Sequence, residues 1–138
     1  MKNLAYGKVG SCFALVVSKH TFSDAEWDGY LTFLRENLMP GIEPKTIVMS
    51  QGASPTAMQR RKLNELTAPY ADKSKIAVVT ESPIVRGVVA ALSWFNPFYR
   101  AFPPQDLDRA LAFLGISGGP AAEVKLMIEM LLQEIHHG

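Results

Sequence analysis

The chain has 138 residues, a formal net charge of +1 at pH 7 and 48% hydrophobic residues. This length suits a single domain. The balanced composition excludes a disordered chain and argues against a dedicated nucleic-acid binder, which would carry a strong basic excess. Cys12 has no second cysteine to pair with, and no apolar run is long enough to span a membrane. We therefore expect a cytoplasmic protein without a signal peptide.

Apolar runs and helical stripes alternate in the first part of the chain. Phe13 to Val17 predicts a buried strand, and Leu4 to Lys8 is expected to pair with it as an edge strand. Ser23 and Glu26 have the spacing of a capping box, which predicts the start of a helix. That helix should end at Pro40-Gly41, and its apolar positions recur at i, i+3, i+4 and i+7. These positions are Trp27, Tyr30, Leu31 and Leu34.

The same alternation continues in the middle of the chain. Thr46 to Met49 predicts a second buried strand, and Ile76 to Val79 predicts a third. Between them, Ser54 as N-cap and Pro55 as first helical residue predict a helix to about Leu66. Its inward positions should be Met58, Leu63 and Leu66. Ser82-Pro83 repeats the same start and predicts a helix from Ile84 to Phe95.

The last third begins with a less regular strand, Phe98 to Phe102. Pro103-Pro104 then turns the chain into a short helix from about Asp106 to Leu114, and Gly118-Gly119-Pro120 resembles a linker. A final helical face should cover its own domain or a neighbouring copy. Its apolar residues are Val124, Met127, Ile128, Leu131, Leu132 and Ile135.

Strands that alternate with helices predict an α/β fold. We expect one mainly parallel sheet of four or five strands with helices on its faces, plus an additional C-terminal amphipathic helix. Residues 1–117 should form the α/β domain. Residues 118–138 should form a helical extension that packs on this domain or on a dimer mate.

Ligands of open parallel sheets bind beyond the carboxyl ends of the strands. The three loops at this edge are Ser18 to Ser23, Ser50 to Thr56 and Thr80 to Arg86. Ser54 and Ser82 offer hydroxyl groups and helix N-termini to an anion or a phosphate, although capping alone accounts for both and is favoured. Arg86 is a candidate anion ligand, because a cation near a helix start is mildly unfavourable; an ordinary surface arginine is the favoured interpretation.

Residues that could perform catalysis are few. Asp24, Glu26 and Asp28 could hold a metal or exchange protons, but acids are favoured at any helix start. His20 follows a strand near the proposed site, with no serine or cysteine motif to activate. The chain lacks Cys/His metal spacing, phosphate-binding and dinucleotide glycine motifs, and a Gly-x-Ser-x-Gly elbow. We therefore expect a protein that is not an enzyme and uses no cofactor or metal.

Aromatic residues are dense between the third helix and the strand after it. Trp94, Phe95, Phe98 and Tyr99 fall within six positions. Aromatic side chains are enriched in binding hot spots. Core packing is the favoured interpretation of this stretch, and an interface or ligand-binding role is the alternative.

Three stretches, Ser23 to Leu34, Ile76 to Asn96 and Tyr99 to Leu114, resemble the STAS-like superfamily. The similarity is to its small branch that includes the sporulation anti-sigma-factor antagonist. The resemblance implies a mixed sheet of four or five strands that serves protein–protein regulation or small-ligand binding. It also implies a regulatory phosphorylation at the start of the second helix. The matching residue is Ser54, with Thr56 as the less favoured choice.

Three functional hypotheses follow. The first is a regulatory module that binds a partner protein through Ser50 to Thr56 and Trp94 to Tyr99. The second, from a different class, is a small-molecule or anion-binding domain, or a weak enzyme, that uses the strand-end crevice. The third, compatible with either, is a homodimer held by Ala121 to His136.

Overall fold

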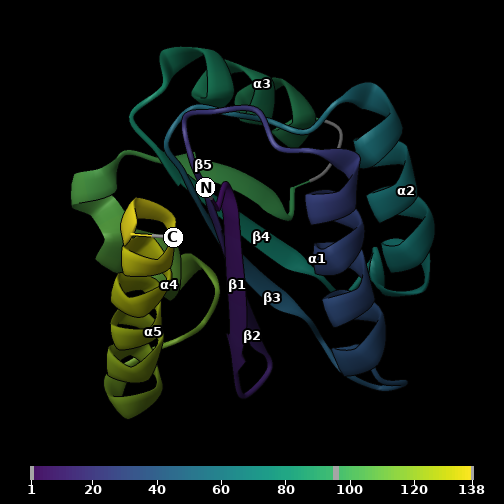
Figure 1. The fold of residues 1–138 in the computed structure, drawn as a ribbon. Coiled ribbons are helices and arrows are strands. Elements are labelled where there is room, and N and C mark those ends of the chain that lie inside the picture. The colour runs from purple at the N-terminus through teal and green to yellow at the C-terminus, as the bar shows by residue number, and fades with distance from the viewer. Residues whose placement is uncertain (1, 95–96, 138) are drawn as a thin grey trace.

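Five strands form one sheet in the order β1-β2-β3-β4-β5 (Figure 1). The computed structural model describes residues 2–94 and 97–137. β1 (Leu4–Val9) pairs antiparallel with β2 (Cys12–Val17), and β3 (Lys45–Ser50), β4 (Lys75–Thr80) and β5 (Tyr99–Phe102) continue the sheet in parallel. The predicted α/β fold with a mainly parallel sheet is confirmed.

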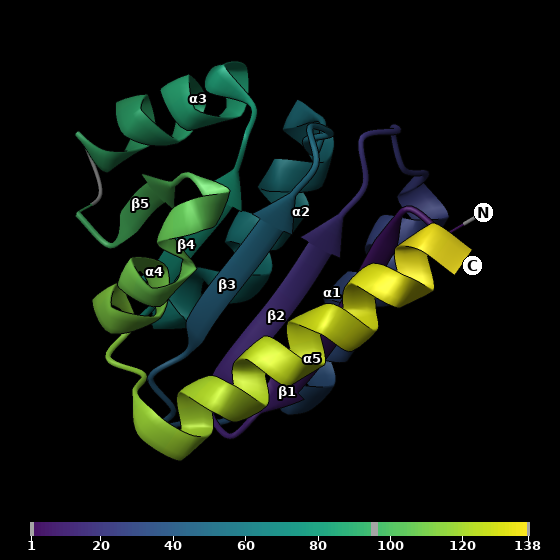
Figure 2. The same ribbon diagram turned by 90° about the vertical axis from the view of Figure 1, so that its left-hand side faces the viewer.

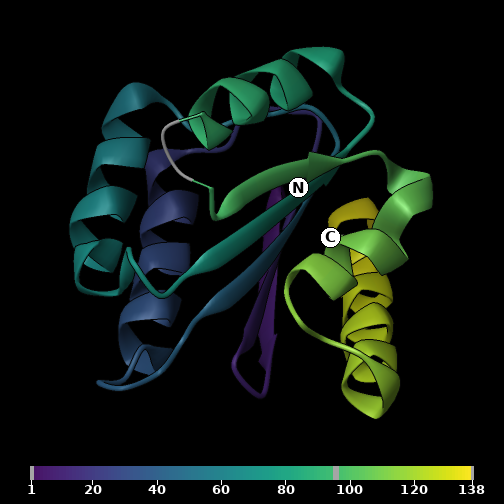
Figure 3. The same ribbon diagram turned by 180° about the vertical axis from the view of Figure 1, so that it is seen from behind.

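Helices cover both faces of this sheet (Figures 1 and 2). α1 (Asp24–Asn37) and α2 (Ala57–Thr67) lie on one face, and α4 (Leu107–Phe113) and α5 (Gly118–His137) lie on the other. α3 (Pro83–Ser93) connects β4 to β5 and packs against both strands, as Figure 3 shows from behind. Short 3-10 turns at Ala68–Tyr70 and Pro104–Asp106 follow α2 and precede α4.

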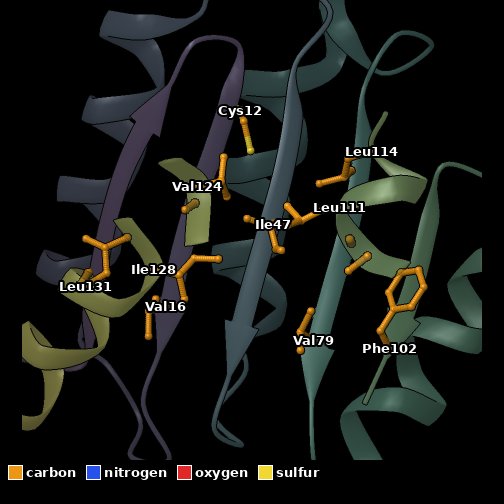
Figure 4. Packing of buried hydrophobic residues seen from close by; sticks show 14 of the residues in the cluster. Cys12, Val16, Ile47, Val79, Phe102, Leu111, Leu114, Val124, Ile128 and Leu131 are labelled. Atoms are coloured by element: carbon orange, nitrogen blue, oxygen red, sulfur yellow. The ribbon is translucent and has the colours of Figure 1, made fainter. Parts of the chain in front are cut away.

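Two cores result, because successive side chains of a strand point to opposite faces of the sheet. From β2, Phe13 and Leu15 pack toward α1, whereas Ala14 and Val16 pack toward α5. Figure 4 shows the second core, in which residues of α4 and α5 meet the sheet. A strand buried on both faces needs an unbroken apolar run, which explains Phe13 to Val17.

α1 begins as the sequence predicts. Ser23 is its N-cap, and the capping box with Glu26 is complete. The predicted stripe of four apolar residues is buried. Within it, the Trp27 ring stacks on Phe22 with the ring centroids 5.4 Å apart, and its Nε1 donates a hydrogen bond to the Gln59 carbonyl at 2.9 Å. This bond ties α1 to α2.

The predicted start of α2 is wrong. Thr56, not Ser54, is the N-cap, and the helix begins at Ala57. Thr56 and Gln59 form a complete capping box: Thr56 Oγ1 accepts from Gln59 N at 3.2 Å, and Gln59 Oε1 accepts from Thr56 N at 2.9 Å. Two reciprocal bonds outweigh the single bond of a serine cap followed by proline. Met58 was predicted to point inward, and this is also wrong: Met58 is exposed, and the next residue, Gln59, is buried instead.

The predicted linker at Gly118-Gly119-Pro120 is wrong as well. These residues form the first turn of α5, where proline loses no helical hydrogen bond. The buried face of α5 packs on β1 and β2 and thus covers its own domain. This face consists of Val124, Ile128, Leu131 and Ile135. The predicted third helix reaches Ser93; its expected end at Phe95 lies outside the described residues.

Cys12 lies in the core between the sheet and the helices α4 and α5. We expect its thiol to react slowly. Burial raises the pKa of the Cys12 thiol to about 11, against a smaller opposite effect of Lys45. The thiolate is the reactive form, so at pH 8 Ellman's reagent should label the folded protein at least about a hundredfold more slowly than the urea-unfolded protein. Absorbance at a fixed reagent concentration measures both rates. Equal rates would show that Cys12 is accessible.

Candidate functional site

Three hydroxyl residues lie together at the carboxyl edge of the sheet. Ser18 follows β2, while Ser50 and Thr80 end β3 and β4 and are paired in register. All three side chains are buried. Each hydroxyl oxygen accepts a hydrogen bond from the backbone N–H two residues later, which closes the loop that follows the strand. The donors are His20 N (3.1 Å), Gly52 N (3.2 Å) and Ser82 N (3.1 Å), respectively.

Further bonds link these loops to one another. The Ala53 N–H donates to the Ser18 carbonyl at 3.1 Å, and the Ser18 hydroxyl donates to Asn3 Oδ1 at 2.9 Å. The Ser50 hydroxyl donates to the Ala53 carbonyl at 3.2 Å. Within the described residues, every buried side-chain nitrogen or oxygen has a hydrogen-bond partner. The buried polar side chains of this edge are therefore bonded within the chain itself.

The predicted anion ligands are placed as follows. Ser54 and Thr56 are exposed, and Thr56 caps α2. Ser82 caps α3, since its Oγ accepts from Val85 N at 3.2 Å, and Arg86 is exposed in the first turns of the same helix. The sheet thus brings the Ser50 and Ser82 loops to one edge, and capping accounts for the Thr56 and Ser82 hydroxyls. Ser18 and Thr80 were missed by the sequence analysis; a hydroxyl residue at three strand ends was the available signal.

The described residues of the aromatic stretch, Trp94, Phe98 and Tyr99, lie at the opposite edge of the sheet. β3, β4 and β5 are parallel; Trp94 and Phe98 precede β5 and Tyr99 begins it, whereas Ser50 ends β3 and the loop to Thr56 follows it (Figures 2 and 3). The Phe98 carbonyl accepts a hydrogen bond from Ile76 N at 2.8 Å, and burial raises the pKa of Tyr99. Phe95 lies outside the described residues. The fold therefore does not bring together the two surfaces that the sequence analysis assigned to a partner.

An apolar face of α3 connects these two edges. Ile84, Val88 and Leu92 recur every four residues and so lie on one side of the helix, and Trp94 follows at its end. Their exposed fractions are 79% (Ile84), 51% (Val88), 44% (Leu92) and 88% (Trp94). In α3, all of whose residues are described, Val89 is the only buried side chain. A helix that is apolar on nearly all sides is usually buried, so this exposure marks the face as unusual.

The acidic residues at the start of α1 have structural partners. Gln59 Nε2 donates to Asp24 Oδ1 at 2.9 Å, and Lys62 Nζ lies 3.3 Å from Asp28 Oδ1. The Glu26 carboxylate accepts from the backbone N–H groups of Asn3 (3.0 Å) and Ser23 (3.2 Å). No group of three or more His, Cys, Asp or Glu in residues 2–94 and 97–137 is placed to hold a metal ion. These contacts favour the structural interpretation of the acids.

Two surface hollows lie away from the strand-end edge. One runs between α1 and α2 and is lined by charged residues that include Asp28, Arg35 and Lys62. The other lies on the outer side of α2, along Arg60 and Arg61. Neither hollow is lined by Ser50, Ser82 or Arg86.

No family model, curated protein or solved structure matches this chain. The similarity to the STAS-like superfamily therefore stays an interpretation of the three sequence stretches and of the order of elements. Among the helices in the described part of the chain, none combines the length and the apolar character needed to cross a membrane.

Proposed function

We propose that this protein is a non-enzymatic, STAS-like regulatory module of the cytoplasm that acts by binding a partner protein through α3. The exposed apolar face of α3 with Trp94 carries this proposal. Contiguous apolar patches on single domains often mark interaction sites. Tryptophan is also among the residues that most often dominate binding energy.

The energetics favour a partner on this face. Burying a fully exposed Ile, Val or Leu side chain contributes about 1.5–3 kcal/mol. Ile84 is 79% exposed, and Val88 and Leu92 are about half exposed, so Ile84 would contribute most of such an energy and the other two about half each. By contrast, the strand-end hydroxyls already bond to their own loops. An anion there would have to displace these bonds. The observations therefore support protein binding over small-molecule binding.

The regulatory part of the proposal is phosphorylation at the start of α2. Ser54 and Thr56 are exposed, so a kinase has access to both hydroxyls. Thr56 is the N-cap, and a phosphate there would face the free N–H groups of the first helical turn. Thr56 is therefore the preferred position, with Ser54 second.

The test starts with gentle purification of the tagged protein from its own cells, followed by identification of the bound proteins and of any phosphate. Each identified partner is then purified and titrated with the wild type, Val88→Glu and Leu126→Glu. Leu126 is 60% exposed on α5 and provides a matched control. We expect Val88→Glu to weaken binding at least about tenfold, because it places a charge in an apolar contact. Leu126→Glu should bind like the wild type.

Two outcomes would contradict the proposal. One is a partner that binds Val88→Glu as tightly as the wild type while both variants keep the wild-type melting temperature. The other is a purified protein that is monomeric and carries a small molecule but no other protein, which would return attention to the strand-end edge.

A further inference from the structure

We infer that the partner that fits α3 is a second copy of this chain; the inference rests on the proposed function and specifies its partner. The reasons are the shape of the α3 surface, an unexplained glycine, the distribution of charge and the area available.

The α3 surface combines a ridge and a shallow row that are complementary to each other. Ile84, Val88 and Leu92 form a ridge at four-residue spacing. The adjacent row at the same spacing holds small side chains, Gly87 and Ala91, and both are exposed. When two such helices cross at about −50°, the four-residue ridges of each fit the grooves of the other. A two-fold axis that runs across the helices, between Val88 and the small row, would make the two copies of α3 antiparallel and lay each ridge over the small row of the other copy.

Gly87 supports the close approach of a second helix. Glycine inside a helix costs about 1 kcal/mol relative to alanine. A Cβ atom at Gly87 would meet no heavy atom within 4 Å. Packing within the chain therefore does not require glycine at this position, whereas the backbone of a neighbouring helix would.

The charge distribution on α3 favours a second copy of this chain over a strongly charged partner. Arg86 is the only charged residue of α3. At 100° per residue, Arg86 points about 160–200° away from Ile84 and Val88, on the other side of the helix. Two copies can therefore meet along the ridge without like-charge repulsion. An acidic or basic partner would find no opposite charge there.

The area available is sufficient for a weak dimer. A fully exposed aromatic side chain presents about 150–250 Å². Trp94, which is 88% exposed, and the three smaller and partly exposed side chains of the ridge together present roughly 500 Å² per copy. Two copies would bury about 1,000 Å², close to the lower bound of a specific interface. We therefore expect reversible dimers with a Kd in roughly the micromolar range.

The interface expected from the sequence, Ala121 to His136, is less suited to this role. Its regular apolar face already packs on β1 and β2. Its exposed large apolar side chains are Leu126 and Met130. These provide the control surface for the test below.

Sedimentation of the purified protein across a wide concentration range tests the inference. The wild type and Leu126→Glu should pass from monomer to dimer as concentration rises. Val88→Glu should dissociate at least about tenfold more readily. All three proteins should keep similar melting temperatures, since both positions are exposed.

Cysteine cross-linking tests the register. Cys12 is buried, so a cysteine introduced on α3 would be the accessible thiol. Under mild oxidation, Val88→Cys should cross-link with itself, because it lies near the two-fold axis. Ile84→Cys should cross-link faster with Leu92→Cys than with itself, because the two helices are antiparallel. Leu126→Cys should give no dimer.

The outcomes separate the inference from the proposed function. A wild type that stays monomeric at every concentration would overturn the inference. If a different purified protein then binds the wild type but not Val88→Glu, the proposed function stands. Dimers that Leu126→Glu disrupts and Val88→Glu leaves intact would also overturn the inference, because they would place the contact on α5.

Discussion

Replacing Trp27 with alanine is expected to destabilise the protein by about 3–5 kcal/mol, the range for large-to-small changes of buried aromatic residues. Trp27 is 2% exposed and contacts the Phe22 and Tyr30 rings at centroid distances of 5.4 and 5.3 Å. The substitution would leave a cavity between α1 and the sheet and remove the donor to the Gln59 carbonyl. Urea denaturation gives the free energy of unfolding that tests this expectation.

Two further variants separate the contributions at this position. Trp27→Phe keeps an aromatic ring but loses the Nε1 donor, so the loss should be smaller, about 1–3 kcal/mol. Trp94→Ala removes the same side chain from an 88% exposed position and should change stability by no more than about 0.5 kcal/mol. A similar loss for Trp27→Ala and Trp94→Ala would contradict the packing of α1 described above.

The second large effect is expected at α5. Ile128 is 3% exposed and lies in the core between α5 and the sheet (Figure 4). Ile128→Ala should cost about 2–5 kcal/mol, because it removes buried methyl groups and leaves a cavity. Leu126→Ala, two residues away on the exposed side, should stay within about 0.5 kcal/mol of the wild type.

Thermal unfolding followed by circular dichroism measures both α5 variants. A chain that ends before Gly118 should unfold at a much lower temperature than the full chain, because Ala5 and Val16 would lose their cover. Equal stabilities of Ile128→Ala and Leu126→Ala would show that α5 does not pack on the sheet. That result would instead favour the alternative prediction, in which this helix covers a neighbouring copy.

Most elements of the fold were predictable from short-range patterns. The Ser23–Glu26 capping box and the four-residue apolar stripe of α1 involve residues within two or three turns of one another. The buried strand at Phe13 to Val17 is likewise visible as a local run. Such signals are complete in the sequence, because the interacting groups are near neighbours along the chain.

The errors occurred where two local signals competed. Ser54-Pro55 and Thr56–Gln59 each predict a helix start. The helix begins after Thr56, where Thr56 and Gln59 form two reciprocal hydrogen bonds. Gly118-Gly119-Pro120 has a linker composition, yet Pro120 suits a first helical turn, and the apolar residues that follow hold the helix on the sheet. In both cases contacts with distant residues add to the local signal that prevails: Gln59 also bonds to Asp24 on α1, and α5 packs on β1 and β2.

The candidate site was less predictable than the fold. The strand-end loops were identified from the order of elements, and the parallel register places Ser50 beside Thr80. The hydroxyl bonds that close these loops join residues two positions apart, and the hydroxyl residue at each strand end was their signal. The bond between Ala53 N and the Ser18 carbonyl joins residues 35 positions apart and left no signal in the sequence. The exposure of α3 was equally hidden, because its composition is that of a buried helix.

The α/β class, the approximate position of each element and the capping of α1 and α3 could be predicted from local patterns, since they depend on periodicity and on bonds between near neighbours. Which faces of the elements are covered became known only from the folded chain. It placed the Ser50 to Thr56 loop at the edge of the sheet opposite to Trp94, Phe98 and Tyr99. It also left Ile84 exposed and Val88 and Leu92 about half exposed. Burial depends on which distant elements pack against a residue, and apolar character alone does not specify those elements.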